Sequence, residues 1–145
     1  MARIEFVRLD ERATVPSRAH DGDAGMDLYS IEEGTIGPGE RLHVRTGLAM
    51  AIPAGFAGLV LPRSGLASRH GVTVANAPGL IDSGYRGELQ VILVNLDLEE
   101  PFSFAAGDRV AQLLVVEYLE AEPTEVEALD ETARGAGGFG SSGRT

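Results

Sequence analysis

The sequence predicts an all-β fold, and two of its features carry that prediction. Short apolar or alternating runs recur along the chain, each ended by Gly, Pro or Asp, whereas few stretches show helical periodicity. Gly and Pro are also abundant, with 19 and 7 copies among 145 residues, and both favour tight turns between short elements. Strands separated by turns in this way are typical of a sandwich, a jelly roll or a barrel.

The first half of the chain contains three expected strands. Residues 4–7 are a weak candidate near the start. Residues 41–45 alternate polar and apolar side chains, which is the pattern of a half-buried strand. Residues 56–61 form an apolar run between Pro53 and Pro62, and we expect a strand there as well.

The second half begins with one expected helical turn at residues 64–69. Residues 90–95 and 110–116 are near-continuous β-branched and aliphatic runs, which suits strands buried on both faces. A weaker strand candidate lies at residues 124–129. Residues 134–145 contain five glycines and one aromatic residue, and this composition alone predicts a disordered tail.

The composition limits the possible functions before any motif is considered. Twelve basic residues against 22 acidic ones give a formal net charge of −10. Such a surface repels nucleic acids and anionic membranes, so neither is expected as a partner. The chain has no Cys, which excludes disulfides and a Cys nucleophile, and all its basic residues are Arg, which excludes a Schiff base on Lys. With no segment that resembles a signal peptide or a membrane span, a single-domain cytoplasmic protein is the expectation.

Five segments hold side chains that can carry chemistry, and they lie at residues 24–28, 62–67, 76–88, 107–112 and 134–142. In the second segment, Arg63, Ser64 and Gly65 can present a guanidinium, a hydroxyl and a free N–H to one phosphate group. In the third, Asp82 begins a predicted hairpin tip that brings its carboxylate close to Tyr85. A carboxylate there can take a proton from water, while the ring offers a flat wall to a sugar.

The other segments carry weaker local signals. Asp27 offers a second carboxylate, and Gln112 enters an apolar strand, where an unpaired amide costs about 1–3 kcal/mol. In the last segment, glycine N–H groups, two Ser hydroxyls and Arg134 can bind an oxyanion. Taken singly, each segment has a plain structural interpretation as a turn, a surface Arg or a disordered tail.

Taken together and in this order, the five segments resemble the five ordered motifs of the trimeric dUTPases, from about Ser17 to Ser142. The resemblance implies a jelly-roll-like β-barrel domain at residues 1–133 that forms a homotrimer, with a flexible Gly/Ser-rich lid at residues 134–145. The reaction it implies is hydrolysis of dUTP to dUMP and pyrophosphate with Mg²⁺, which lowers dUTP and supplies dUMP for thymidylate synthesis.

The resemblance also implies a role for each matching residue. The catalytic residues are Asp82, which activates the attacking water, Gln112, which helps to hold that water, and Tyr85, which packs under the deoxyribose and leaves no room for a 2′-hydroxyl. Asp27 anchors Mg²⁺ through water, while the substrate phosphates hold the ion otherwise. Phe139 stacks over the uracil. The residues expected to bind substrate are Arg63, Ser64, Gly65, Asn76, Leu80, Ile81, Asp82, Tyr85, Gln90, Gln112, Arg134, Phe139, Gly140, Ser141 and Ser142.

The family pattern implies active sites shared among three subunits. One chain supplies the segments around Asp27, Arg63 and Gln112, a second supplies the predicted hairpin, and a third supplies the tail. Trimer formation is implied by the resemblance alone.

Two rival functions stay open beside this one. A dCTP deaminase or a bifunctional deaminase–diphosphatase shares the fold but needs a glutamate as proton shuttle, and Glu88 is the only glutamate near the predicted hairpin. A dUTPase-like protein that binds nucleotide in order to regulate a partner can dispense with a water-activating carboxylate, which this chain has in Asp82.

Overall fold

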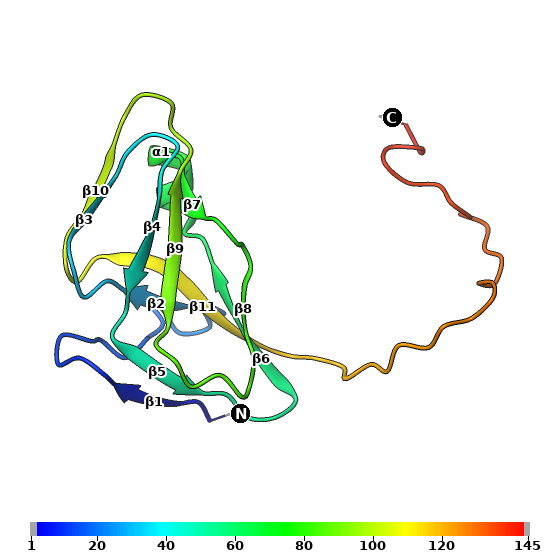
Figure 1. The fold of residues 1–145 in the computed structure, drawn as a ribbon, viewed down its shortest axis with the longest axis horizontal. Coiled ribbons are helices and arrows are strands. Elements are labelled where there is room, and N and C mark those ends of the chain that lie inside the picture. Colours follow the sequence, from blue (N-terminus) through cyan, green and yellow to red (C-terminus); the bar gives the residue numbers. More distant parts are fainter. Residues whose placement is uncertain (1–2, 144–145) are drawn as a thin grey trace.

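Strands carry nearly all of the regular structure in the computed structural model, which describes residues 3–143 (Figure 1). The all-β class predicted from the sequence is therefore confirmed. Within these residues the elements are, in chain order, β1 (Glu5–Arg8), β2 (Met26–Tyr29), β3 (Gly34–Ile36), β4 (Arg41–Arg45), β5 (Leu48–Ala51), β6 (Phe56–Leu61), α1 (Ser64–His70), β7 (Val72–Val74), β8 (Gly79–Ile81), β9 (Gln90–Asn95), β10 (Phe102–Phe104) and β11 (Arg109–Glu117). The outer ends of the predicted domain and tail, residues 1–2 and 144–145, lie outside the described residues.

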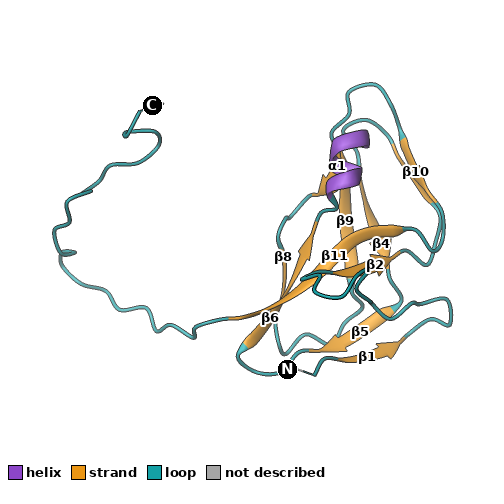
Figure 2. Cartoon of the chain, turned by 180° about the vertical axis from the view of Figure 1, so that it is seen from behind, coloured by secondary structure: helices purple, strands orange, loops and turns teal. Residues whose placement is uncertain are grey.

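Antiparallel pairing assembles these strands into four small sheets in the described chain (Figures 1 and 2). The largest has the strand order β2–β11–β6–β8, and a three-stranded sheet has the order β4–β9–β7. Two strand pairs, β1 with β5 and β3 with β10, complete the set. In both views β11 crosses the direction of β4 and β9, and side chains of both larger sheets join one core cluster.

The core consists of inward-facing aliphatic side chains. Leu28 of β2, Val44 of β4, Val91 of β9 and Leu113 of β11 have no exposed surface. Burying side chains of this kind stabilises the fold by about 1.5–3 kcal/mol each. The short strands are therefore held in place mainly by this shared core and by their backbone pairing.

Most of the strands expected from the sequence are confirmed. β4, β6 and β9 have the predicted limits, β11 is one residue longer at each end, β1 begins one residue later, and α1 covers the expected helical turn. The expectation that β9 and β11 are buried on both faces is wrong, because Leu114–Val116 of β11 and alternate residues of β9 are only partly buried. Burial alternates along β9, from the exposed Gln90 to the buried Asn95, because the rest of the described chain covers its outer face only in part.

The strand expected at residues 124–129 is absent from the described chain, so that prediction is wrong. Residues 117–136 are all exposed. A strand needs a neighbouring strand to pair with its backbone N–H and C=O groups, and none lies beside this segment in the described chain.

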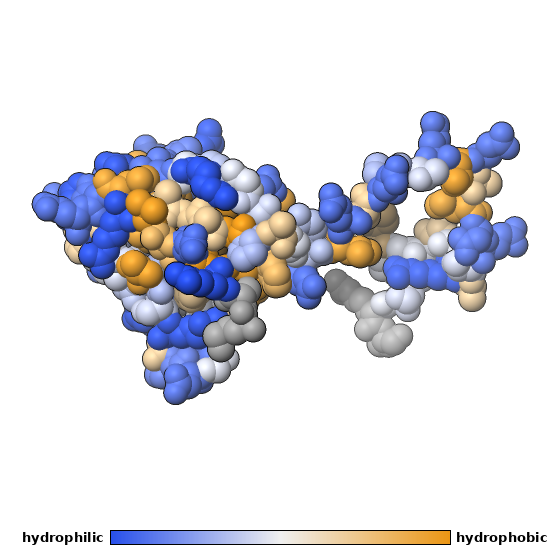
Figure 3. All heavy atoms as spheres, turned by 90° about the horizontal axis from the view of Figure 1, so that it is seen from below, coloured by the Kyte–Doolittle hydropathy of each residue, from blue (hydrophilic) through white to orange (hydrophobic). Residues whose placement is uncertain are grey.

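Beyond β11 the chain leaves the barrel as an extended arm, residues 118–143 (Figures 1 and 3). Its exposed apolar side chains include Leu119, Val126, Leu129 and Phe139. Residues 118–133 carry six acidic side chains and no basic one. Among residues 3–143, no helix has both the length and the apolar character of a membrane span.

Asn95, at the end of β9, is a fully buried polar residue whose amide meets three backbone groups. Its Nδ2 donates to the carbonyl oxygens of Ile36, at 3.0 Å, and Glu100, at 2.9 Å, and its Oδ1 accepts the N–H of Asp97 at 2.9 Å. The N–H groups of Glu100 and Glu99 in turn hold the pKa of the Asp97 carboxyl below its usual value. Asn95 thus ties β3 and the β9–β10 connection to the end of β9.

We expect Asn95→Ala to lower the free energy of unfolding by about 3 kcal/mol, because the carbonyl of the buried Ile36 loses its partner along with two less buried backbone groups, and an orphaned buried group costs about 1–3 kcal/mol. Urea denaturation at fixed chain concentration measures this change. The control is Ser103→Ala, which removes an exposed hydrogen bond to Thr35 and is expected to change stability by less than about 0.5 kcal/mol. Equal effects in the two variants would contradict the role assigned to Asn95.

Candidate functional site

Polar residues from separate parts of the chain line a hollow of about 400 Å³, here named the polar hollow. It brings together five of the residues predicted for the site, namely Asp27, Arg63, Ser64, Gly65 and Gln112. The whole lining comprises Ala19, Asp23, Ala24, Gly25, Asp27, Arg63, Ser64, Gly65, Arg109 and Gln112. β2, the junction of β6 with α1, and β11 each contribute to it.

Strand register explains why these residues meet. Gln112 of β11 lies opposite Asp27 of β2 on one side and opposite Leu61 of β6 on the other. Because β6 ends at Leu61, Arg63 follows at the same edge of the sheet. The Gln112 Nε2 donates to the carbonyl oxygen of Pro62 at 3.4 Å, which gives this amide the partner that its apolar surroundings require.

A β-bulge near the start of β11 determines which side chains reach the polar hollow. The pairing with β2 shifts register between Arg109 and Ala111, and both Val110 and Ala111 are buried. In a regular strand, Arg109 and Gln112 would point to opposite faces, since successive side chains alternate. The bulge changes this alternation, and both residues line the same hollow.

The Asp27 carboxylate lies between two guanidinium groups. Its Oδ1 is 3.8 Å from the Arg63 Nε and its Oδ2 is 3.3 Å from the Arg109 Nη1. The Arg63 Nη1 also donates to the backbone carbonyl of Arg109 at 3.0 Å. With Asp23 included, two acidic and two basic side chains line the hollow, so their formal charges cancel.

Gly25 permits the close approach of Gln112. A Cβ atom at position 25 would lie 2.8 Å from the Gln112 Oε1 and 3.5 Å from its Cβ. Any larger residue at position 25 would therefore displace the Gln112 amide.

The donor set in the hollow suits a cation only when a ligand supplies most of the coordination. Among residues 3–143, no group of three or more His, Asp or Glu side chains is arranged to hold a metal ion. Asp27 contributes a single, largely buried carboxylate. Mg²⁺ fits such a site, because it keeps several waters and is commonly bound by one or two carboxylates together with substrate phosphates.

A second cavity, of about 350 Å³ and here named the sheet pocket, opens between β8 and the β4–β9 pair. It brings together Asn76, Leu80, Ile81, Tyr85 and Gln90, all predicted to bind substrate. Its other lining residues are His43, Val60, Val74, Gly79, Glu88, Leu89 and Ile92. β8 is the last strand of its sheet and pairs only with β6 in the described chain. The outer edge of β8 therefore has backbone groups available to a ligand.

The loop after β8 differs from the hairpin expected at Asp82. A tight turn does form, since the N–H of Tyr85 donates to the carbonyl of Asp82 at 3.1 Å. However, β8 and β9, which flank this loop, belong to different sheets, so the hairpin prediction is wrong. Periodicity and turn residues define a turn but not the partner of the following strand. The Asp82 side chain is exposed and lines neither cavity.

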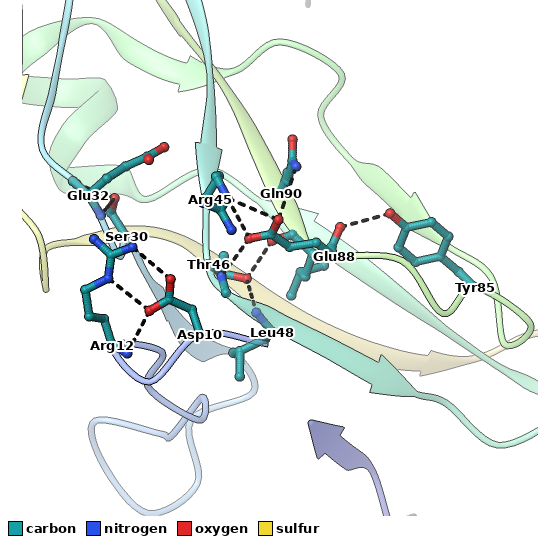
Figure 4. A network of polar contacts seen from close by, with 12 residues as sticks. Asp10, Arg12, Ser30, Glu32, Arg45, Thr46, Leu48, Tyr85, Glu88 and Gln90 are labelled. Atoms are coloured by element: carbon teal, nitrogen blue, oxygen red, sulfur yellow. Dashed lines mark hydrogen bonds and ion pairs between the residues drawn. The ribbon is translucent and has the colours of Figure 1, made fainter. Parts of the chain in front are cut away.

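Glu88 holds the end of this loop on the barrel (Figure 4). Its carboxylate accepts the backbone N–H of Gly47 at 3.0 Å and the Arg45 Nε at 3.2 Å. Its backbone carbonyl accepts the Tyr85 hydroxyl at 2.9 Å. The Tyr85 ring lies so close to Gly87 that a Cβ there would be 2.7 Å from the ring carbon Cζ.

The N-terminal segment also bonds to Gly47. The N–H of Leu9 donates to the carbonyl of Gly47 at 2.8 Å, and the next residue, Asp10, accepts hydrogen bonds from both the side chain and the backbone of Arg12. The Arg12 guanidinium and its N–H hold the pKa of the Asp10 carboxyl well below its usual range. Asp10 in turn raises the pKa of Arg12.

The third set of predicted residues lies on the arm. Arg134, Phe139, Gly140, Ser141 and Ser142 line one concave turn, together with Gly137 and Gly138. The N–H of Ser141 donates to the carbonyl of Gly138 at 2.9 Å, and the Arg134 Nε donates to that of Gly137 at 2.8 Å. Phe139 is fully exposed in a left-handed backbone conformation, with φ of 50°. This large ring thus has no apolar partner in the described chain.

The predicted site residues therefore fall into three sets that share no lining residue, with Asp82 outside all three. Sequence reasoning missed Arg109 of the polar hollow and His43 and Glu88 of the sheet pocket. Arg109 stands in one of the five segments, but a regular strand would have turned it away from Gln112. No sequence signal connects His43 with residues of β8.

Comparison with known proteins identifies one family. The family model described as dUTPase matches residues 11–143. Deoxyuridine 5′-triphosphate nucleotidohydrolase of Mycobacterium leprae is 56% identical over 97% of this chain and 94% of its own length. The protein of the same name from Corynebacterium glutamicum is 51% identical over 100% of this chain and 97% of its own length.

Two solved structures are similar throughout the fold. A mutant dUTPase of Staphylococcus bacteriophage 80alpha with dUpNHpp has a TM-score of 0.91 and 29% identity, covering 98% of this chain and 99% of that one. A mutant dUTPase of phage phi11 of S. aureus, described for its coordination of a structural Mg(II) ion, has a TM-score of 0.82 and 27% identity, covering 89% of this chain and 99% of that one. On the match of the family model and on relatives more than half identical in sequence, this chain belongs to the dUTPase family.

Proposed function

We propose that this protein hydrolyses dUTP to dUMP and pyrophosphate, which lowers dUTP and supplies dUMP for thymidylate synthesis. The observation that carries the proposal is the division of the site into three sets of residues, each suited to a different part of the nucleotide. The polar hollow suits the triphosphate, the sheet pocket suits the base and sugar, and the arm turn suits closure over both. The relatives' names and the dUpNHpp bound to the phage enzyme support the same substrate. The cytoplasmic location stays a prediction of the sequence.

The triphosphate would bind in the polar hollow. Arg63 and Arg109 offer guanidinium groups, and Ser64 a hydroxyl, to the phosphate oxygens. The formal charges of the two acidic and two basic side chains in the hollow cancel. The hollow therefore cannot neutralise the charge of a triphosphate by itself. Asp27 would hold Mg²⁺ through water, and the ion would supply positive charge beside the phosphates. Arg134 of an arm would add a further cation.

Asp82 would act as the general base. Its carboxylate takes a proton from a water whose oxygen attacks the α-phosphorus in line, while the amide of Gln112 helps to hold that water. The bond from the α-phosphorus to the bridging oxygen breaks, and pyrophosphate leaves with the bonding electrons. The exposed position of Asp82 supports this role, because its carboxylate is accessible to the substrate of another chain.

Uracil would be recognised by hydrogen bonds at the outer edge of β8. Alternate residues of β8 direct their backbone N–H and C=O groups to that edge, and Leu80, Ile81 and Asn76 line the pocket beside it. Cytosine presents a reversed set of donors and acceptors and would leave some of these groups unpaired, which disfavours it strongly. Close contact with the backbone would exclude the 5-methyl of thymine.

The deoxyribose would pack on Tyr85, whose ring lines the sheet pocket beside Gln90. Ring contact at the 2′ position leaves no space for a ribose hydroxyl. This arrangement would discriminate against UTP.

A homotrimer would bring the three sets together, with the hollow from one chain, the sheet pocket and Asp82 from a second and the arm from a third. The separation of the sets within one chain supports this arrangement. So does the arm, which stands clear of its own barrel (Figure 3) and carries the fully exposed Phe139. Stacking of that ring on uracil would give it an apolar partner, and closure of the arm would exclude bulk water.

The deaminase alternative receives no support from Glu88. Its carboxylate is bonded to Gly47 and Arg45, which leaves it poorly placed as a proton shuttle. The regulator alternative differs from the proposal only in turnover, and a direct assay separates the two.

The first test is pyrophosphate release with Mg²⁺ from dUTP, dTTP, dCTP and UTP in parallel. We expect release from dUTP alone, because the proposed pocket selects both base and sugar. Ammonia release from dCTP would favour the deaminase. Binding of dUTP without any release would favour the regulator.

Asp82→Asn removes the proposed base and retains the size of the side chain. We expect kcat for dUTP to fall by about 10²–10⁴-fold, while Kd for dUpNHpp, measured by calorimetry, stays nearly unchanged. Full turnover in this variant would contradict the assignment of Asp82.

Mixed trimers test whether active sites are shared. Asp82→Asn chains and chains truncated before Arg134 should each be inactive alone. The two variants are mixed in equal amounts so that trimers form at random. If Asp82 and the arm come from different chains, about one quarter of the sites should be active, because each of the two chains has a chance of about one half of being the intact one. Activity is measured after the two variants are refolded together. In the control, each variant is refolded separately and the two samples are mixed immediately before the assay. If co-refolded and control samples are equally inactive, the shared site is wrong.

A further inference from the structure

The loop from Asp82 to Leu89, here named the Tyr85 loop, carries two of the proposed catalytic residues. Several of its hydrogen bonds are internal: Tyr85 N–H to the Asp82 carbonyl, and Arg86 Nη1 to the carbonyls of Ser83 and Tyr85. Such bonds shape the loop but do not fix its place on the barrel.

The bonds from this loop to the barrel converge at its last two residues. Glu88 bonds Gly47 and Arg45 through its carboxylate. The next residue, Leu89, donates its N–H to the carbonyl of Leu48 at 2.7 Å, and its carbonyl accepts the hydroxyl of Thr46. All four partners belong to β4, β5 or the turn between them.

Glu88 also makes direct contact with proposed substrate residues on both sides (Figure 4). Its backbone carbonyl accepts the Tyr85 hydroxyl at 2.9 Å, and its carboxylate lies 3.5 Å from the Gln90 Nε2. Only 16% of its side chain is exposed. Glu88 is thus bonded both to the β4–β5 turn, through its carboxylate, and to the Tyr85 hydroxyl, through its carbonyl.

We propose that Glu88 is a positioning residue for sugar selection, and this rests on the proposed function. Its carboxylate fixes the Tyr85 loop to the β4–β5 turn, so that the ring of Tyr85 stays against the 2′ position of the nucleotide. The carboxylate matters here, because both of its oxygens face donors: Oε1 accepts N–H groups of Gly47 and Arg45, and Oε2 faces the Arg45 Nε at 3.2 Å and the Gln90 Nε2 at 3.5 Å. An amide in its place offers one acceptor oxygen and turns an NH₂ group toward a donor.

The test compares Glu88→Gln with Glu40→Gln. Glu40 is a matched control, since its carboxylate also accepts a backbone N–H, that of Gly37 at 3.0 Å, but it lies outside both cavities. For each protein, kcat/KM is measured with dUTP and with UTP. We expect Glu88→Gln to lower the ratio of dUTP to UTP by about tenfold, because a small displacement of a positioning group is sufficient for such a loss. Glu40→Gln should leave the ratio unchanged.

A second readout does not depend on activity. The chain has three tyrosines and no tryptophan, so 3-fluorotyrosine labelling gives a simple ¹⁹F NMR spectrum in which Tyr85→Phe identifies the Tyr85 signal. We expect Glu88→Gln to move that signal and to leave those of Tyr29 and Tyr118 in place. If Glu88→Gln fails to fold, Arg45→Gln removes the same ion pair from the other side and should give both effects.

The outcomes separate this proposal from the proposed function. An unmoved Tyr85 signal overturns the positioning role, whatever the enzyme hydrolyses. A moved signal with an unchanged dUTP to UTP ratio overturns the selection role while leaving hydrolysis of dUTP intact. A wild-type protein that fails to hydrolyse dUTP overturns the proposed function, and sugar selection with it, even where the Tyr85 signal moves.

Discussion

β11 is bonded along both edges, to β2 and to β6, and the candidate phosphate site depends on that double register. Gln112 lies opposite Asp27 on one side and opposite Leu61 on the other. This register brings the Asp27 carboxylate, the Gln112 amide and the start of α1 together at the polar hollow. A shift by one residue would turn every side chain of β11 to the other face. The bulge after Arg109 adds a second cation to the same edge without disturbing the buried residues that follow.

Local patterns were sufficient for much of the fold. The alternation at residues 41–45 and the apolar runs at 56–61 and 90–95 define strands whose limits the structure reproduces. Pairing was not predictable in the same way, because the partner of a strand depends on the core and on the chain path around it. The turn at Asp82 therefore formed as expected, whereas the strands around it joined different sheets.

For the candidate site, the order of the motifs predicted a set of residues and only part of their arrangement. Asp27, Arg63 and Gln112 meet in one hollow, as the family pattern implies. Arg109 was missed because the alternation rule fails at a bulge. Glu88 was weighed only as a possible proton shuttle, since its role depends on Gly47, about forty residues away in sequence and adjacent only in the folded chain.

The acidic side chains of the arm also affect contacts between molecules. An extended, apolar-containing segment with free backbone groups is a template for cross-β stacking. Along residues 124–129, however, Glu125 and Glu127 flank Val126, so an in-register stack would place like charges directly above one another. Repulsion between these glutamates therefore opposes aggregation through this segment. That protection would weaken in high salt, which screens the repulsion between these glutamates.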